Sequence, residues 1–223
     1  MVKLVVYFKR RAGMEVEPFQ EYWRTRHAEV VRELPGLRRY VQSHTLLGGY
    51  RKGEPAYDGT AEVWFDDVDA IRALGGTDAL RAVQEDEARF IDRSTMKTIV
   101  TDEHLIKDSE LPEGRVKNIE FVQRRPDLGV DEFQRYWREV HGPLAREIPM
   151  ILRYVQSHCR RGGYANGRQP PCDGVAITWF ESTAAMRESA RTEAYARTRA
   201  DEAHFIAAGE LPFIITREHI VIA

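Results

Sequence analysis

The sequence is poor in cysteine and lacks long apolar runs. Its 223 residues contain two cysteines, Cys159 and Cys172, whose number and spacing support neither a disulfide framework nor a zinc module. No stretch reaches the roughly 20 consecutive apolar residues that a membrane helix needs. The apolar segment at the start is too short for a signal peptide, and basic residues follow it at once. We therefore expect a soluble, cytoplasmic protein with no membrane partner.

The chain also lacks a large excess of charge of either sign. Lysine and arginine number 33, aspartate and glutamate number 35, and the formal net charge is −2. Acidic residues interleave with the arginines, so we predict no basic patch and no nucleic-acid partner. Apolar residues make up 43% of the chain, which is too many for general disorder. The length suits one large domain or two domains of about 100 residues each.

What the sequence does contain is an internal duplication. Residues 3–106 align with residues 117–221 at an offset of 114, which becomes 115 after one inserted residue near Pro170. The string Arg-Tyr-Val-Gln-Ser-His, for example, occurs at 39–44 and again at 153–158. We predict a first repeat over residues 1–107, a polar linker over 108–116 and a second repeat over 117–223.

Both repeats show the same order of predicted elements. In the first repeat, strand patterns cover residues 4–8, 37–45, 61–65 and 98–106, and helical spacing covers 16–30 and 68–91, with a break near Gly75-Gly76. The order βαββαβ is the ferredoxin-like pattern of α+β proteins. One such unit leaves a sheet face bare, so two fused copies gain about 25 cal/mol per Å² by burying these faces together in a barrel. We predict a pseudo-two-fold α+β barrel, an intramolecular pseudo-dimer, with a further homodimer left open.

Histidine and tryptophan occur almost entirely in equivalent pairs across the repeats. Trp23 and His27 lie four residues apart and share one helical face, while Tyr40, Gln42 and His44 alternate and share one strand face. If the helix packs on that strand, these side chains line one cleft. A histidine is the usual general acid or base near neutral pH, and a tyrosine hydroxyl can donate to an oxyanion. The second repeat offers the equivalent set Trp137, His141, Tyr154, Gln156 and His158.

A structural role stays open for these side chains, and structural roles are favoured for the other candidates. His44 and its counterpart could close a strand end by a hydrogen bond. Arg10-Arg11 could hold a carboxylate or phenolate, although a solvated loop is the simpler interpretation. Asp58-Gly59 fits ordinary turn chemistry. Asp201 and His204 lie one helical turn apart, but an arginine stands at the position equivalent to His204, so we predict no metal site.

The motif Arg-Arg, Phe-x-x-Tyr-Trp-x-x-x-His and Arg-Tyr-x-Gln-x-His, present in both repeats, resembles the EthD domain. This family belongs to the dimeric α+β barrel (ferredoxin-like) superfamily, and the resemblance covers nearly the whole chain, twice. The similar methylmuconolactone isomerases are ascribed a helix histidine and a strand tyrosine. The resemblance implies that His27, Tyr40, His141 and Tyr154 are catalytic. The shared helix and strand faces favour substrate binding by Trp23, Gln42, His44, Trp137, Gln156 and His158.

The residues and the resemblance together favour a cofactor-free lyase or isomerase. It would act by proton transfer, dehydration or decarboxylation on a small aromatic, lactone or polyketide-like substrate, in catabolism or secondary metabolism. One alternative is a non-catalytic protein that binds a hydrophobic metabolite or assists an oxygenase pathway. A haem-binding protein or a cofactor-free monooxygenase is another. The region around Tyr57 and Cys172 differs between the repeats, so the two sites can differ in substrate or activity.

Overall fold

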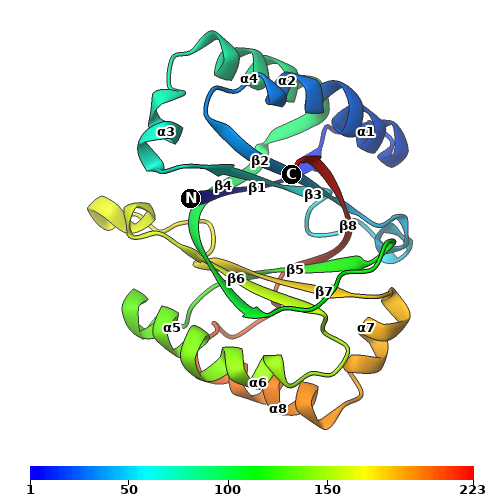
Figure 1. Cartoon of the computed structure of the whole chain (residues 1–223), viewed down its shortest axis with the longest axis vertical. Coiled ribbons are helices and arrows are strands. Elements are labelled where there is room, and N and C mark those ends of the chain that lie inside the picture. Colours follow the sequence, from blue (N-terminus) through cyan, green and yellow to red (C-terminus); the bar gives the residue numbers. More distant parts are fainter. The chain divides into compact units, whose positions relative to one another are not determined.

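The computed structural model describes residues 1–223, which form two compact units. Unit 1 comprises Met1–Val100 with Glu218–Ala223, and unit 2 comprises Thr101–Arg217. In each unit, a layer of helices covers one face of an antiparallel sheet (Figure 1). Two long strands, β4 (Ile91–Lys107) and β8 (Phe213–Ile222), contribute residues to both units. None of the helices has the length and apolar character that crossing a bilayer requires.

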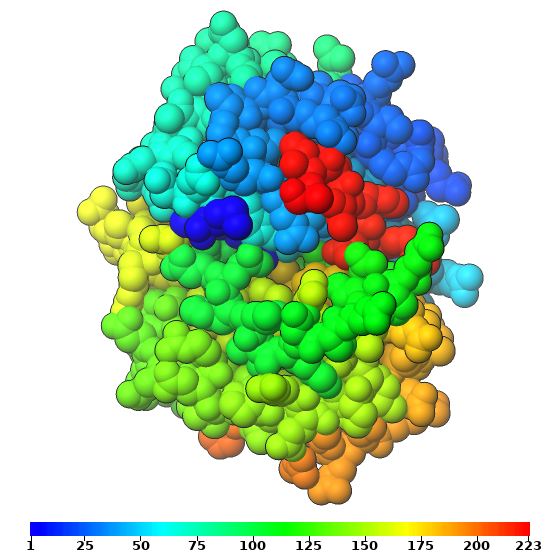
Figure 2. All heavy atoms as spheres, viewed as in Figure 1, coloured from blue at the N-terminus to red at the C-terminus, as the bar shows by residue number.

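Unit 1 has the βαββαβ order predicted from the first repeat. Its elements are β1 (Val2–Arg10), α1 (Val16–Tyr22), the π-helix η1 (Trp23–His27), α2 (Ala28–Arg32), β2 (Leu37–Thr45), the 3-10 helix η2 (Leu47–Lys52), β3 (Gly59–Phe65), α3 (Val68–Ala73), α4 (Asp78–Phe90) and the first part of β4. The strands lie in the order β4-β1-β3-β2-β8. The end of β8 lies on the surface of this unit, where Arg32 donates to the carbonyl oxygen of Val221 (Figure 2).

Unit 2 repeats this order with the second half of the chain. Its elements are the end of β4, β5 (Val116–Val122), α5 (Val130–Tyr136), the π-helix η3 (Trp137–His141), α6 (Gly142–Arg146), β6 (Arg153–Cys159), the 3-10 helix η4 (Arg161–Gly167), β7 (Gly174–Phe180), α7 (Thr183–Ser189), α8 (Glu193–Asp201), the 3-10 helix η5 (Glu202–His204) and the first part of β8. The strands lie in the order β8-β5-β7-β6-β4. In β5, the side chains of residues 118, 120 and 122 lie on one face of the sheet, because successive side chains of a strand point to opposite faces.

Local sequence explains where the helices begin. The side chain of Asp67 accepts from the backbone N–H of Ala70 at the start of α3, and that of Thr77 caps α4 in the same way. Ser182 and Thr192 cap α7 and α8 in unit 2. The last strand of unit 1 begins at Ile91 rather than at the predicted residue 98, because the chain passes from α4 directly into extended backbone.

The two π-helices were not predicted from the sequence. The spacing of Phe19, Trp23 and His27 indicates one continuous α-helix, yet the backbone widens to a π-helix over Trp23–His27 and over Trp137–His141. In each unit, the carbonyl oxygen of the first π residue accepts a hydrogen bond from a strand glutamine, at 2.8 Å. This bond ties the wide turn to the sheet, and such turns often mark functional sites.

Gly59 and Gly174 do more than form the turns that the sequence suggested. Each begins a central strand directly under a tryptophan of the π-helix. A Cβ on Gly59 would lie 2.3 Å from Cζ3 of Trp23, and a Cβ on Gly174 would lie 2.6 Å from Cζ3 of Trp137. Only glycine permits this close approach of indole and strand, so it positions both tryptophans.

Candidate functional site

His141 in unit 2 is paired with a buried carboxylate. It ends the π-helix η3, and its Nδ1 lies 2.9 Å from Oδ2 of Asp201 at the end of α8. An ionised carboxylate only accepts, so Nδ1 carries the proton and Nε2 presents a lone pair. The hydroxyl of Tyr136 donates to the other carboxylate oxygen at 2.7 Å and holds it in place. This partner was not predicted from the sequence, because it lies 60 positions along the chain from the histidine.

Burial determines the protonation state of this imidazole. Burial lowers the pKa of His141 below its ordinary value of 6.5, and the hydrogen bond and charge of Asp201 oppose this shift without cancelling it. The ring is therefore neutral at pH 7. A neutral ring whose tautomer is held by a carboxylate can accept a proton at Nε2.

Unit 1 contains the same arrangement. Nδ1 of His27 lies 2.8 Å from Oδ2 of Asp86, and the hydroxyl of Tyr22 donates to Oδ1 at 2.6 Å. Burial again lowers the pKa of the imidazole. The two aspartates belong to the Asp-Glu-Ala string that both repeats share, so this shared string was the signal that could have revealed them.

Tyr154 in unit 2 is held by two donors. Its hydroxyl oxygen accepts from Nε1 of Trp137 at 3.1 Å and from Nε2 of Gln156 at 3.0 Å. A phenolic oxygen has two lone pairs and one proton, and both lone pairs are now occupied. No protein acceptor takes the proton, so the O–H is left to donate to a ligand. Burial raises the pKa of Tyr154, which keeps this proton on the oxygen at neutral pH.

The matching hydroxyl of Tyr40 in unit 1 has the same two donors. Nε1 of Trp23 lies 3.1 Å from the oxygen and Nε2 of Gln42 lies 2.9 Å from it. Burial raises the pKa of Tyr40 in the same way. Trp23 therefore has two kinds of contact: its indole N–H donates to the hydroxyl of Tyr40, and its ring stacks on the imidazole of His44.

Neither predicted histidine–tyrosine pair forms a direct hydrogen bond. In unit 2, His141 and Tyr154 instead line one cavity of about 590 Å³ between the helix layer and the sheet. This volume lies within the range of small-molecule sites. The cavity is lined by Asn118, Glu120, Val122, Trp137, His141, Ala145, Ile148, Ile151, Tyr154, Ala176, Thr178, Phe180, Met186, Arg187, Ser189, Ala190, Tyr195, Thr198, Arg199, Glu202, Ile206, Gly209, Glu210, Leu211 and Phe213. Several of the α7, α8 and pre-β8 residues in this set are exposed, so the cavity opens on that side.

Gln156 and His158, predicted to bind substrate, lie behind the cavity wall. Nε2 of His158 donates to the side-chain oxygen of Gln156 at 3.0 Å, and its ring stacks on Trp137 at 4.5 Å. Burial lowers the pKa of His158 to about 3, so this ring is neutral. The ring of His104 meets it edge-on at 4.6 Å. In this arrangement the glutamine and the histidine position Trp137 and Tyr154.

His44 and Gln42 occupy the same places in unit 1. Nε2 of His44 lies 3.0 Å from the side-chain oxygen of Gln42, and its ring stacks on Trp23 at 4.2 Å. The ring of His219 meets His44 edge-on at 4.7 Å. Burial lowers the pKa of His44 well below its ordinary value.

Two carboxyl groups in the unit 2 cavity were not predicted as site residues. Burial raises the pKa of Glu202 to about 7 and also raises the pKa of Glu120. Glu202 has a counterpart in Glu87, whose pKa burial likewise raises to about 7. Glu120 has no acidic counterpart, because Val6 occupies the equivalent position in unit 1. Comparison of the two repeats therefore could not identify Glu120 as a candidate site residue.

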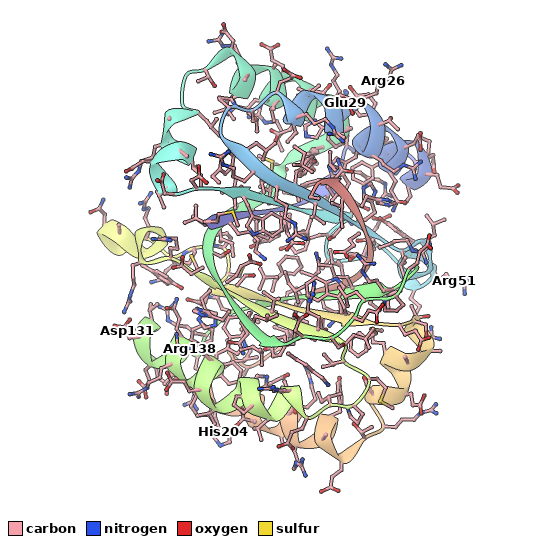
Figure 3. All side chains as sticks on the ribbon, in the orientation of Figure 1. Arg26, Glu29, Arg51, Asp131, Arg138 and His204 are labelled. Atoms are coloured by element: carbon pink, nitrogen blue, oxygen red, sulfur yellow. The ribbon has the colours of Figure 1, made fainter.

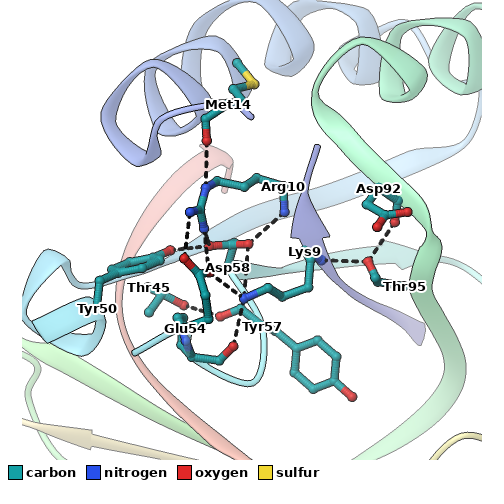
Figure 4. Close-up of polar contacts among 11 residues, drawn as sticks. Lys9, Arg10, Met14, Thr45, Tyr50, Glu54, Tyr57, Asp58, Asp92 and Thr95 are labelled. Carbon is teal, nitrogen blue, oxygen red and sulfur yellow. Dashed lines mark hydrogen bonds and ion pairs between the residues drawn. The ribbon is translucent and has the colours of Figure 1, made fainter. Parts of the chain in front are cut away.

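Arg10, the last residue of β1, does not present a free anion site. The guanidinium of Arg10 contacts Oδ1 of Asp58 at 2.6 Å and Oε1 of Glu54 at 2.8 Å (Figure 4). The hydroxyl of Tyr50 also donates to Asp58, at 2.5 Å. Carboxylates of the chain itself therefore occupy the fork that could have held a ligand anion. This cluster ties β1 to the loop before β3.

His204 and Asp201 do not form a metal site. The imidazole Nδ1–H of His204 donates to the backbone oxygen of Asp201, and its side chain is 65% exposed on the outer surface of unit 2 (Figure 3). The carboxylate of Asp201 accepts a hydrogen bond from Nδ1 of His141 instead. The structure brings together no group of three or more His, Cys, Asp or Glu side chains that could hold a metal ion. Neither cysteine forms a disulfide bond, and both are buried.

Two βαββαβ units, each with a helix imidazole–carboxylate pair and a strand tyrosine, define the ferredoxin-like, dimeric α+β barrel class predicted from the sequence. The chain belongs to the EthD family: the EthD domain matches residues 11–94 and again residues 125–209. None of the curated proteins compared with the chain matches it.

Solved structures share the fold at low sequence identity. An anthrone oxidase-like protein has a TM-score of 0.69 at 10% identity, covering 99% of this chain and 93% of that protein. A candidate monooxygenase from Lactobacillus acidophilus NCFM has a TM-score of 0.58 at 11% identity, covering 98% and 94%. A mutant chlorite dismutase from Candidatus Nitrospira defluvii has a TM-score of 0.54 at 11% identity, covering 99% and 91%. At this identity the likeness shows the fold alone.

Proposed function

We propose that unit 2 catalyses proton transfer next to a carbonyl group of a small aromatic, lactone or polyketide-like substrate, without a cofactor. One observation carries the proposal: a neutral imidazole held by a carboxylate and an unpaired tyrosine O–H line the same cavity. The base is Nε2 of His141, and the hydrogen-bond donor is the hydroxyl of Tyr154.

The chemistry needs these two groups together. Nε2 of His141 takes a proton from a carbon that lies beside the carbonyl or is conjugated with it, and the electron pair of the C–H bond moves to the carbonyl oxygen. Tyr154 donates to the resulting enolate oxygen, which is stabilised most when the charge develops. Return of the proton to another carbon isomerises the substrate, and departure of a leaving group from the enolate completes an elimination. Trp137 supplies a flat wall beside the reacting atoms.

The names of the similar structures bear on the proton abstraction itself rather than on the step that follows it. One similar structure is named an anthrone oxidase-like protein, and anthrone is an aromatic ketone with an acidic C–H; another is named a monooxygenase. Proton abstraction would precede either isomerisation or oxidation, so these names support the abstraction step rather than a particular product. Abstraction and its consequence therefore need separate tests.

Deuterium exchange into anthrone measures abstraction at a C–H that is conjugated with the carbonyl through the aromatic rings, so the electron pair again moves to the carbonyl oxygen. The protein in D2O should speed loss of the C10 proton signal, followed by NMR under argon, above the rate in buffer alone. His141→Phe should remove this acceleration, and the matched variant His27→Phe in unit 1 tests whether the other imidazole contributes. An oxygen electrode then shows whether the anthrone is also oxidised in air.

The possible results separate the candidate functions. Loss of exchange in the folded His141→Phe variant supports the proton-transfer site in unit 2. Full exchange in a variant with both histidines replaced refutes it. Saturable binding of anthrone with no exchange above buffer favours the alternative, a protein that binds a hydrophobic metabolite for an oxygenase pathway.

A further inference from the structure

The two units differ most in the polarity of the space between helices and sheet. Six lining positions carry polar side chains in unit 2 and apolar ones at the equivalent positions of unit 1. In unit 2 they are Asn118, Glu120, Thr178, Ser189, Tyr195 and Thr198. In unit 1 they are Leu4, Val6, Val63, Leu74, Leu80 and Val83, and all six pack in or against its hydrophobic core. A shared fold does not require this difference, because the same elements surround both spaces.

The polar groups in unit 2 are not fully satisfied by one another. Asn118 donates through Nδ2 to Oε1 of Glu120 at 3.2 Å, but its own carbonyl oxygen Oδ1 is buried without a hydrogen-bond partner. No protein donor reaches the second oxygen of Glu120. Tyr154 is only 2% exposed, and its hydroxyl has no acceptor for its proton. Buried groups of this kind cost free energy unless a ligand or water completes them.

We propose that the unit 2 cavity selects a hydroxylated aromatic ligand, with Glu120 and Asn118 accepting hydrogen bonds from its hydroxyl groups. The inference rests on the proposed function, since it names the ligand class of that same cavity. The acceptors are the lone pair of His141, the free oxygen of Glu120 and Oδ1 of Asn118, and the hydroxyl of Tyr154 is left as a donor because both of its lone pairs are occupied. The hydroxyl groups of Thr178 and Tyr195 also line the cavity and can both donate and accept, and the exposed guanidinium of Arg187 adds a donor. A ligand that matches them carries several O–H groups and one carbonyl or comparable acceptor.

The same residues disfavour a ligand that carries a carboxylate. Glu120 and Glu202 both line the cavity, and burial already disfavours their ionised forms, so a ligand carboxylate beside them would add a further costly charge. The guanidinium of Arg199 already donates to Oε1 of Glu202 at 2.8 Å. Glu120 is thus the residue that sets specificity in unit 2, and unit 1 lacks it because Val6 stands in its place.

Calorimetric binding of two matched probes tests this assignment. The probes are 1,3-dihydroxynaphthalene and 1,3-dimethoxynaphthalene, which share a ring system and differ in hydroxyl protons. Wild type should bind the dihydroxy compound about tenfold more tightly or better, as expected for a hydrogen bond to a charged or polar acceptor. Glu120→Val, which installs the unit 1 residue, should remove most of this preference. Glu120→Gln keeps an acceptor oxygen and should retain most of it.

The variants and the probes give results that can be told apart. Equal preference in wild type and in a folded Glu120→Val protein overturns the assignment, as does failure of wild type to bind either probe. If Glu120→Val does not fold, Asn118→Leu, which also installs the unit 1 residue, must lower the preference. Loss of the hydroxyl preference in Glu120→Val, with anthrone exchange absent from wild type, would contradict the proposed proton transfer and leave the ligand assignment standing.

Discussion

Replacing Asp201 by asparagine should remove the base of unit 2 while leaving its fold intact. The carboxylate accepts two hydrogen bonds, from Nδ1 of His141 at 2.9 Å and from the hydroxyl of Tyr136 at 2.7 Å. An asparagine has one acceptor oxygen and one donor group. If the oxygen stays with the tyrosine, the amide NH2 faces the imidazole, Nδ1 must accept, and the proton moves to Nε2. The lone pair that should take the substrate proton is then lost.

The magnitude follows from the two roles of the carboxylate. Two hydrogen bonds remain possible in the variant, so unfolding should become easier by only about 1 kcal/mol. A positioned general base contributes roughly 10²–10⁴ in rate, which corresponds to about 2.7–5.5 kcal/mol in the activation barrier. Activity should therefore fall by far more than stability does.

The assay combines anthrone exchange in D2O with thermal unfolding. Asp201→Asn should lose at least about a hundredfold of the protein-dependent exchange. The matched variant Asp86→Asn changes the same contact in unit 1 and reports how much that unit contributes. Exchange at the wild-type rate in a folded Asp201→Asn protein would refute the reasoning, because it would show that the tautomer of His141 does not matter.

Two further predictions concern the glycine under the indole and the pH dependence. Gly174→Ala places a Cβ 2.6 Å from Trp137, so thermal or urea unfolding should show a loss of about 1–3 kcal/mol, whereas Gly162→Ala, with nothing within 4 Å, should be close to neutral. Burial lowers the pKa of His141 below 6.5, so exchange should persist below pH 6.5 and fall only as the pH drops through the lowered value; a midpoint above 6.5 would contradict this. The same shift means that the unfolded chain takes up the proton first, so stability should decline as the pH falls below about 6.5.

The repeats and the order of elements could be predicted from the sequence because they depend on local patterns. Alternating apolar residues indicate strands, and the spacing of Phe19, Trp23 and His27 indicates a helix with one buried face. The positions of glycine and proline residues predict the loops between these elements. The π-helix could not be predicted from such patterns, because its extra width depends on the hydrogen bond from Gln42 and on the fit of Trp23 over Gly59.

The candidate residues were predicted in part for the same reason. Tyr154 and Gln156 alternate on one strand face, and their shared hydrogen bond agrees with that spacing. The partner of His141 could not be obtained in this way, since Asp201 comes from another helix. Glu120 offered no pattern at all, because an isolated glutamate in a strand resembles any solvent-facing residue.

The sequence by itself determined that two similar βαββαβ repeats exist and which aromatic and histidine side chains share a face, because both follow from residue spacing and from self-similarity. The tertiary structure decided which polar groups contact one another. It brought the carboxylates to the imidazoles, used up both lone pairs of each tyrosine oxygen, and left polar side chains around a cavity in unit 2 where unit 1 packs apolar ones. The physical reason is that the chemistry of a buried polar group depends on its neighbours, and those neighbours come from distant parts of the chain.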